Sequence, residues 1–266
     1  MYDYRKELYC TSSPYIINHN IQEYDITKAD ISILFTKGVI TEEQYLILKN
    51  SSKEVRNISI GYLLKDKKLS ELYYNALAEY RKRFIKENNI RDENIVSVRK
   101  DSFFIMDQPV NVLVFDNLVE FTPKKHYTIF INVCRLQILY NYDMFRNVET
   151  VDVKGIADEK LPLHGECMML FLCELFEYLS SGTMQDTIEF LQNFLKKYTA
   201  RELPVGYYRE FNPDSQYRII ITQFTNYQLQ NATEEQKQYL DISYNANFIR
   251  ELFGIVSSIY FGNFKR

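Results

Sequence analysis

The chain has 266 residues, a formal net charge of −3 from 32 basic and 35 acidic side chains, and 46% hydrophobic residues. This balance is typical of a globular protein and excludes a disordered or fibrous chain and a strongly basic nucleic-acid coat, although a local basic groove stays possible. Its 22 tyrosines and 18 phenylalanines, with only 8 glycines and 6 prolines, predict a packed aromatic core and few long loops.

The cysteines and the ends of the sequence indicate the compartment. The four cysteines form no CxxC pair and the three histidines are scattered, so we expect free thiols in a reducing compartment instead of a zinc site. The first ten residues are polar and lack the apolar core of a signal peptide. The longest apolar stretch, 167–179, contains two glutamates and is shorter than the ~20 residues of a membrane span. We therefore expect a cytoplasmic protein (host cytoplasm if phage-encoded) with no membrane partner.

The first third of the chain is predicted to be mainly helical after a short extended run at 21–26. Thr41 is a candidate N-cap, and the acidic residues after it begin a short helix that ends at Lys49. A second helix is expected at 53–64. The longest is expected at 70–88, where apolar side chains recur at helical spacing.

The pattern then changes to the alternation that is typical of strands. Residues 95–106 predict one strand, with 111–115 as its hairpin partner. Further strands are expected at 126–139, 149–155 and 217–224. The remaining helices are expected at 166–179, 183–198 and 247–260.

This order of elements predicts an α+β fold, with an antiparallel sheet, packed helices and a helical C-terminal part. Gly155, Pro162 and Gly165 mark a weak boundary. We expect an α+β domain over residues 1–160 and a mainly helical domain over 161–266 packed on it.

Three short patterns carry residues that are suited to chemistry. Asp25 closes an extended run, where a carboxylate can hold a divalent cation at the edge of a sheet. Lys53, Asn57 and Gly61 are spaced by four, so they share one face of a helix. Asp101 interrupts an apolar strand, where an ionised group is costly unless it lies at a turn or binds a cation. Structural roles also fit: Asp25 can cap a helix start, and Asp101 can lie on the exposed face of a hairpin.

In this order the residues resemble the palm of phage-type DNA polymerases of family B. Asp25 matches the aspartate that closes the strand of the first motif. Lys53, Asn57 and Gly61 match the second motif, Lys-x-x-x-Asn-Ser-x-Tyr-Gly, at the same spacing, although isoleucines replace its serine and tyrosine.

The third motif of that family, Asp-Thr-Asp-Ser, is matched in its second half by Asp101 and Ser102, while Arg99 stands where the first aspartate would be. After this motif such enzymes carry a lysine that faces the primer terminus, and Lys154 before Gly155 is similar to it. The resemblance covers about residues 20–160 and implies a palm-like sheet.

The chemistry that this resemblance implies is Mg²⁺-dependent nucleotidyl transfer on nucleic acid. Asp25 and Asp101 would be the catalytic metal ligands, and Lys154 would hold the primer phosphates. Lys53 would neutralise the nucleotide triphosphate, with Asn57 and Gly61 on the same nucleotide-binding face.

The long helix at 70–88 also carries a basic cluster. Arg81, Lys82, Arg83 and Lys86 are expected on its outer face, as a nucleic-acid-binding surface or as an ordinary solvated helix face.

Two other hypotheses stay open beside the transferase. The first is a palm-derived or unrelated protein without catalysis, which binds nucleic acid or a phage replication or transcription protein. Arg99 favours it, because a cation at that position opposes Mg²⁺. The second is an interaction or virion component held by its aromatic surfaces. The Asn-, Ile-, Lys- and Tyr-rich composition suits an AT-rich phage genome. The distance between the carboxylates of Asp25 and Asp101 decides whether they can share a cation.

Overall fold

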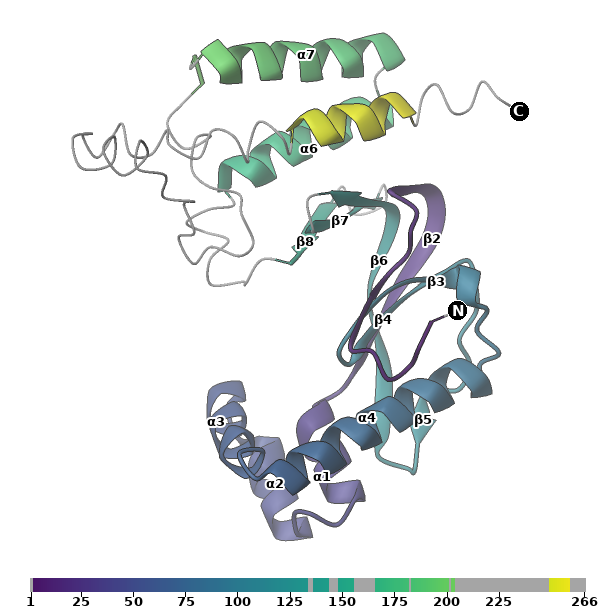
Figure 1. The fold of residues 1–266 in the computed structure, drawn as a ribbon, viewed down its shortest axis with the longest axis vertical. Helices are drawn as coiled ribbons and strands as arrows, with labels where there is room; N and C mark the ends of the chain where they lie inside the picture. The colour runs from purple at the N-terminus through teal and green to yellow at the C-terminus, as the bar shows by residue number, and fades with distance from the viewer. Residues whose placement is uncertain are drawn as a thin grey trace, which may run out of the picture. The chain divides into compact units, whose positions relative to one another are not determined.

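The computed structural model describes residues 2–133, 136–143, 148–155, 166–181, 183–200, 202–203 and 249–258. The chain forms two compact units (Figure 1). Unit 1 comprises residues 1–12 and 18–127, and unit 2 comprises 13–17 and 128–266. The strand predicted at 217–224, together with Pro162 and Gly165 of the expected boundary, lies outside the described residues.

Four α-helices of unit 1 lie where local signals favour them. Their bounds are α1 Ala29–Thr36, α2 Glu42–Asn50, α3 Lys53–Leu63 and α4 Lys67–Glu87, and a short 3₁₀ turn follows at Asp92–Asn94. Thr41 begins α2 with a capping box, in which its side chain accepts from the Gln44 amide and the Gln44 side chain accepts from the Thr41 amide. Asp66 caps α4 by accepting from two backbone amides, so this helix begins earlier than the apolar spacing predicted.

Within each unit the strands pair antiparallel. Their bounds are β1 Leu8–Cys10, β2 Tyr15–Ile26, β3 Ile95–Arg99, β4 Ser102–Met106, β5 Val114–Phe115, β6 Val119–Val133, β7 Leu136–Asp143 and β8 Val148–Lys154. The order across the sheet is β1-β3-β4-β2-β6-β7-β8, and β5 pairs with β6.

The single strand predicted at 95–106 is in fact the hairpin β3–β4. Arg99 pairs with Ser102, so Lys100 and Asp101 alone form the turn, with Lys100 in the left-handed region at φ 54°. The expected hairpin partner at 111–115 was wrong, because its last two residues, β5, pair with β6 instead.

The core of unit 1 lies between α4 and one face of the sheet. Leu77, Tyr80 and Phe84 of α4 pack against Tyr24 and Phe103 of the strands. The Phe84 ring stacks on that of Phe103, with 4.9 Å between ring centroids. Because side chains alternate along a strand, Asp25 projects from the face of the sheet opposite α4.

Unit 2 combines the far strands with helices. β7 and β8 pack with α6 (Glu166–Ser181), α7 (Met184–Ala200) and a helix at 249–258 around a second core. These helices confirm the predictions at 166–179 and 183–198 and, over its described part, the one at 247–260. The helices expected from residue 161 onward thus share a unit with β7 and β8.

The observed class is α+β, as predicted. In the described ranges no helix combines the length and the apolar character needed to cross a membrane.

Candidate functional site

Two of the carboxylates singled out in the sequence lie on neighbouring strands of unit 1. In the antiparallel pair β2–β4, Asp25 is directly opposite Ser102, and the Ser102 hydroxyl donates to Asp25 Oδ1 at 2.8 Å. Asp101 is the residue before Ser102, and its carbonyl accepts from the Ile26 amide at 3.2 Å. The hairpin register therefore brings Asp101 beside the end of β2, where Asp25 lies.

The electrostatics of this cluster show that the carboxylates interact. Burial, and to a lesser extent the charges of Asp25 and Asp30, raise the pKa of Asp101 from 3.8 to about 6. Burial also raises the pKa of the Tyr73 hydroxyl, and the charges of Asp101 and Asp30 add to the increase. Asp25, Asp30 and Asp101 thus create one negative field at the end of β2, and we refer to these three residues as the acidic cluster.

Arg56 connects this cluster to α3. Its Nε lies 3.5 Å from Asp30 Oδ2, and the two side chains are 12% and 22% exposed. The same Nε is buried without a hydrogen bond. The ion pair fixes α3 beside the start of α1. Lys53, Asn57 and Gly61 are all exposed on α3, so they share a solvent-facing side of the helix as their spacing predicted.

Arg99 lies on the same face of the sheet as Asp25. It pairs with Ser102, which in turn pairs with Asp25, and side chains of directly opposed residues project from one face. Burial lowers the pKa of Arg99. The positive charge of Arg99 on β3 therefore lies beside Ser102 of β4.

Lys154 is the one catalytic candidate that lies outside unit 1. It ends β8, opposite Gln137 of β7, in unit 2. Unit 1 therefore brings together Asp25 and Asp101, and its geometry carries no information on Lys154.

The basic residues of α4 do not form one outer face. Arg81 is only 1% exposed, and its guanidinium donates to the carbonyls of Tyr4 at 3.0 Å and Lys100 at 2.8 Å. Its expected place on the outer face is wrong, because these two carbonyls take up donors of the side chain. Arg81 instead joins the N-terminal segment to the turn that carries Asp101.

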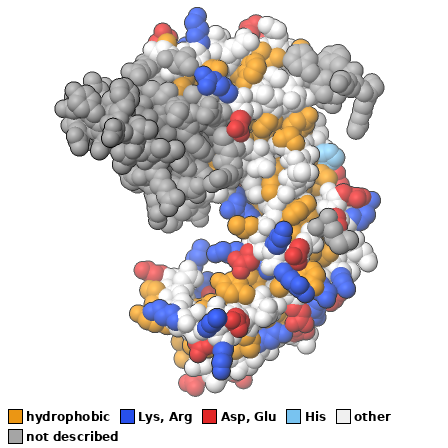
Figure 2. Space-filling model, viewed as in Figure 1, with side chains coloured by type: hydrophobic (Ala, Val, Ile, Leu, Met, Phe, Trp, Pro, Cys, Tyr) orange, Lys and Arg blue, Asp and Glu red, His pale blue; other side chains and the backbone are white. Residues whose placement is uncertain are grey.

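The other three basic residues of the run differ in their surroundings. Arg83 is engaged by Asp116 at 2.8 Å and by Glu87 at 3.1 Å. Lys82 lies over the Tyr4 ring, and Lys86 is exposed. On the visible face of unit 1, basic side chains are interspersed with acidic ones (Figure 2). Any nucleic-acid contact in this region therefore needs a local arrangement and cannot rest on a uniform basic surface.

The described residues contain no group of three or more His, Cys, Asp or Glu side chains arranged to hold a metal ion. A cation at the acidic cluster would take two carboxylates from the chain and its other oxygens from water and substrate phosphates, which is how Mg²⁺ commonly binds. The oxygen ligands of the acidic cluster are therefore of the type that Mg²⁺ prefers, provided that water and phosphates complete its coordination.

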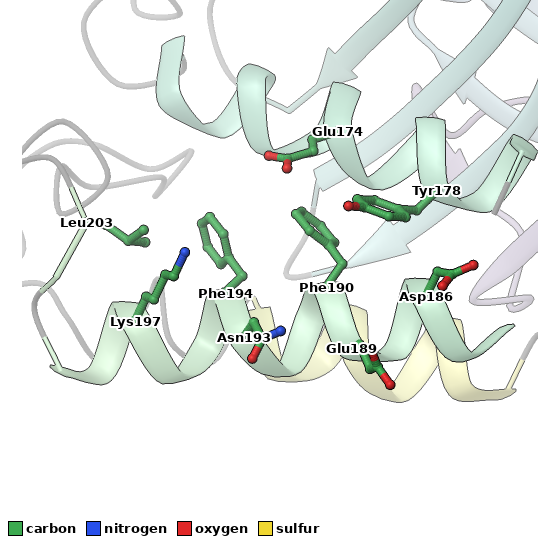
Figure 3. A pocket seen from close by; sticks show the side chains of 9 residues that line it. All are labelled: Glu174, Tyr178, Asp186, Glu189, Phe190, Asn193, Phe194, Lys197 and Leu203. Atoms are coloured by element: carbon green, nitrogen blue, oxygen red, sulfur yellow. The ribbon is translucent and has the colours of Figure 1, made fainter. Parts of the chain in front are cut away.

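A pocket of about 470 Å³ in unit 2 was not indicated by the sequence analysis. It lies between α6 and α7, with Phe190 and Phe194 pointing toward α6 (Figure 3). The rings of Tyr178 and Phe190 stack at 4.9 Å, and Glu174 also lines the pocket. The spacing of Glu174 and Tyr178, four residues apart on one helix face, is the signal that was available.

Together, the described fold and site define an α+β protein with an acidic cluster at the end of an antiparallel strand pair. A protein-family model, the bacteriophage PBS1 gene 130 protein, matches residues 2–258. The chain belongs to this phage protein family, which confirms the phage origin expected from the sequence. No curated protein matches the chain.

Proposed function

We propose that unit 1 is the palm-like part of a Mg²⁺-dependent nucleotidyltransferase that acts on nucleic acid. The supporting observation is the register of β2 and β4, which places Asp25 opposite Ser102 and next to Asp101. Asp25 and Asp101 lie 76 positions apart in the sequence, and the motif resemblance pairs them. Asp101 adjoins the end of β2 through its backbone, and the charge of Asp25 raises the pKa of Asp101, which supports two carboxylates near enough to share a cation.

Mg²⁺ would be held by Asp25 and Asp101 and would supply electrostatic stabilisation to the phosphoryl group in transfer. The chain's own residues prepare this site. The Ser102 hydroxyl orients Asp25 by donating to Oδ1. Arg56 partly offsets the charge of Asp30, so that the site does not accumulate three uncompensated carboxylates.

The nucleotide is proposed to approach the exposed side of α3. Lys53 offers its ammonium to the triphosphate there, while Asn57 offers an amide and Gly61 leaves open space beside the helix. Lys154 as the primer-phosphate contact belongs to the same proposal, with its support in the motif resemblance.

The test is nucleotide incorporation by the full chain on primed DNA and RNA templates with Mg²⁺. Asp25→Ala and Asp101→Ala should each abolish incorporation, since each removes one of the two metal ligands. Asp107→Asn, an exposed carboxylate at the far end of β4, is the matched control and should leave it unchanged. Incorporation that survives both alanine substitutions would refute the proposal.

Arg99 specifically favours a second candidate, a palm-derived protein that binds nucleic acid or a phage replication or transcription protein without catalysis. A guanidinium on the same face as Asp25 opposes a dication there. This candidate predicts single-stranded DNA binding that weakens steeply with salt and is indifferent to Mg²⁺. Wild-type incorporation that depends on Mg²⁺ would exclude it.

A further inference from the structure

A separate cavity of unit 1 lies between the N-terminal segment and α4. Its volume is about 310 Å³, and its walls include Tyr4 and Arg5 from the segment and Tyr74, Arg81 and Lys82 from α4. Because residues three or four apart adjoin on a helix, Tyr74 and Arg81 belong to one stripe that also carries Ala78. Ala78 is small, which leaves the space between them open.

The side chains that line the cavity carry an excess of positive charge once the ion pair of Glu79 is taken into account. Arg5, Arg81 and Lys82 line it, together with Glu7 and Glu79. Glu79 is engaged by Lys37 from α1, with Nζ 3.2 Å from Oε2. Arg5, Arg81 and Lys82 thus leave a net positive charge against Glu7, although the guanidinium of Arg81 is buried against two backbone carbonyls. This balance favours an anionic ligand.

Aromatic rings complete the walls. The Tyr4 ring is approached by the Lys82 ammonium at 5.2 Å and by the Arg5 guanidinium at 5.9 Å from its centroid. Tyr74 is 42% exposed, so a large part of its ring is open to a ligand. A cationic groove with exposed aromatic rings is the arrangement by which proteins hold single-stranded nucleic acid, since phosphates meet the cations and bases stack on the rings.

We infer that this cavity binds one nucleotide unit of a single strand, with its phosphate toward Arg5 and Lys82 and its base against Tyr74. The volume is large enough for one nucleotide. The same chemistry would recognise a free nucleoside monophosphate. The inference adds a strand-binding site to the proposed transferase and also holds for a protein without catalysis.

The cavity is connected to the acidic cluster through its own wall. Arg81 donates to the Lys100 carbonyl at 2.8 Å, and the Lys100 amide donates to the Glu7 carbonyl at 2.6 Å. Asp101 is the next residue of that turn. A strand held in the cavity thus contacts the side chain that supports the Asp101 turn.

The experiment measures binding of a fluorescein-labelled oligothymidylate to the full chain by anisotropy at low salt. The double variant Arg5→Gln/Lys82→Gln should weaken binding at least about tenfold through lost phosphate contacts. Tyr74→Ala should weaken it about fivefold or more through lost stacking. Both changes affect side chains outside the core, and circular dichroism verifies folding.

The matched control is Lys67→Gln/Lys68→Gln, which removes the same charge from exposed positions of the same helix outside the cavity. It should change binding less than twofold. An equal loss in the control, or unchanged binding in both cavity variants, would overturn the inference. Thymidine monophosphate as a competitor distinguishes the sources: displacement at millimolar concentration assigns a free nucleotide, and no displacement assigns a unit of a strand. Asp25→Asn should lose nucleotide incorporation and keep strand binding. The transferase proposal and this inference can therefore fail independently of each other.

Discussion

Replacing Asp101 by asparagine should stabilise the metal-free protein at neutral pH. Burial and the charge of Asp25 raise the pKa of Asp101 from 3.8 to about 6, so the ionised carboxylate is less favourable in the folded than in the unfolded chain. Asparagine has the same shape and no charge. It removes the repulsion and leaves the turn intact.

The magnitude follows from the difference between the two pKa values. Each pKa unit corresponds to about 1.4 kcal/mol, so full ionisation costs at most ~3 kcal/mol. Because Asp101 is partly exposed, solvent screening reduces this to about 1–2 kcal/mol. The folded-state pKa is the raised one. The favourable contribution of the protonated carboxyl is therefore complete below about pH 4 and is lost as the pH rises through about 6.

The assay is urea unfolding of wild type and Asp101→Asn between about pH 4 and pH 8 in EDTA, followed by circular dichroism. The gain in the free energy of unfolding should be near zero at the acid end and largest at pH 8. Asp107→Asn is the control, because the pKa of Asp107 is shifted in the opposite direction. The hydrogen bond from His19 lowers it, so asparagine should give no gain in the free energy of unfolding. A gain of Asp101→Asn that is independent of pH, or a loss at pH 8, would refute the reasoning.

Phe84→Ala should cost about 3–5 kcal/mol, because its ring is fully buried between Phe103 and Phe121, whereas exposed Leu72→Ala should stay within about 0.5 kcal/mol. Thermal unfolding checks both, and equal effects would contradict the packing. Arg81→Met should destabilise by about 2–4 kcal/mol, since two carbonyls lose their donor in a buried place, and an unchanged melting temperature would count against that role. Thr41→Ala should cost about 1 kcal/mol through the lost cap of α2, and Thr41→Ser should restore it in the same assay.

The sequence predicted α2, α3 and most of α4 because their signals are local, although α4 begins at Lys67, before its predicted start. Thr41, Ser52 and Asp66 each accept from amides of the first turn, and these residue types are recognisable without a structure. The turn at Lys100 and Asp101 escaped prediction for the opposite reason. It contains no glycine although Lys100 has a positive φ, so the sequence lacks the residue that usually marks a two-residue turn.

The segment after Pro109 shows a long-range cause that a sequence pattern cannot reveal. Its backbone amides at Asn111 and Val112 donate to the Asn88 side-chain oxygen at 2.9 and 2.7 Å. The Asn88 amide group in turn donates to the Val112 carbonyl at 2.8 Å. A single side chain at the end of α4 thus takes the hydrogen bonds that a partner strand would have supplied.

The candidate site also contains residues that local signals identify and one residue, Arg81, whose role depends on long-range contacts. Asp25 and Asp101 were found because each breaks a local expectation, a charge at the end of or within an apolar run. The burial of Arg81 was missed because a run of three basic residues usually faces water, and only the fold brings the carbonyls of Tyr4 and Lys100 to its guanidinium.

The charges around Asp25 determine what Mg²⁺ binding must involve. Arg56 and Arg99 can balance two carboxylates, and the third, Asp101, holds its proton to about pH 6. The metal-free cluster is then close to neutral under mildly acidic conditions. A dication that uses Asp101 must displace this proton, so Mg²⁺ affinity in the transferase proposal has to rise as the pH passes through about 6 and binding has to release a proton. Strand binding without catalysis requires neither effect, because it uses no carboxylate of the acidic cluster. The coupling between proton and metal, more than the presence of the aspartates, therefore separates the two proposed functions.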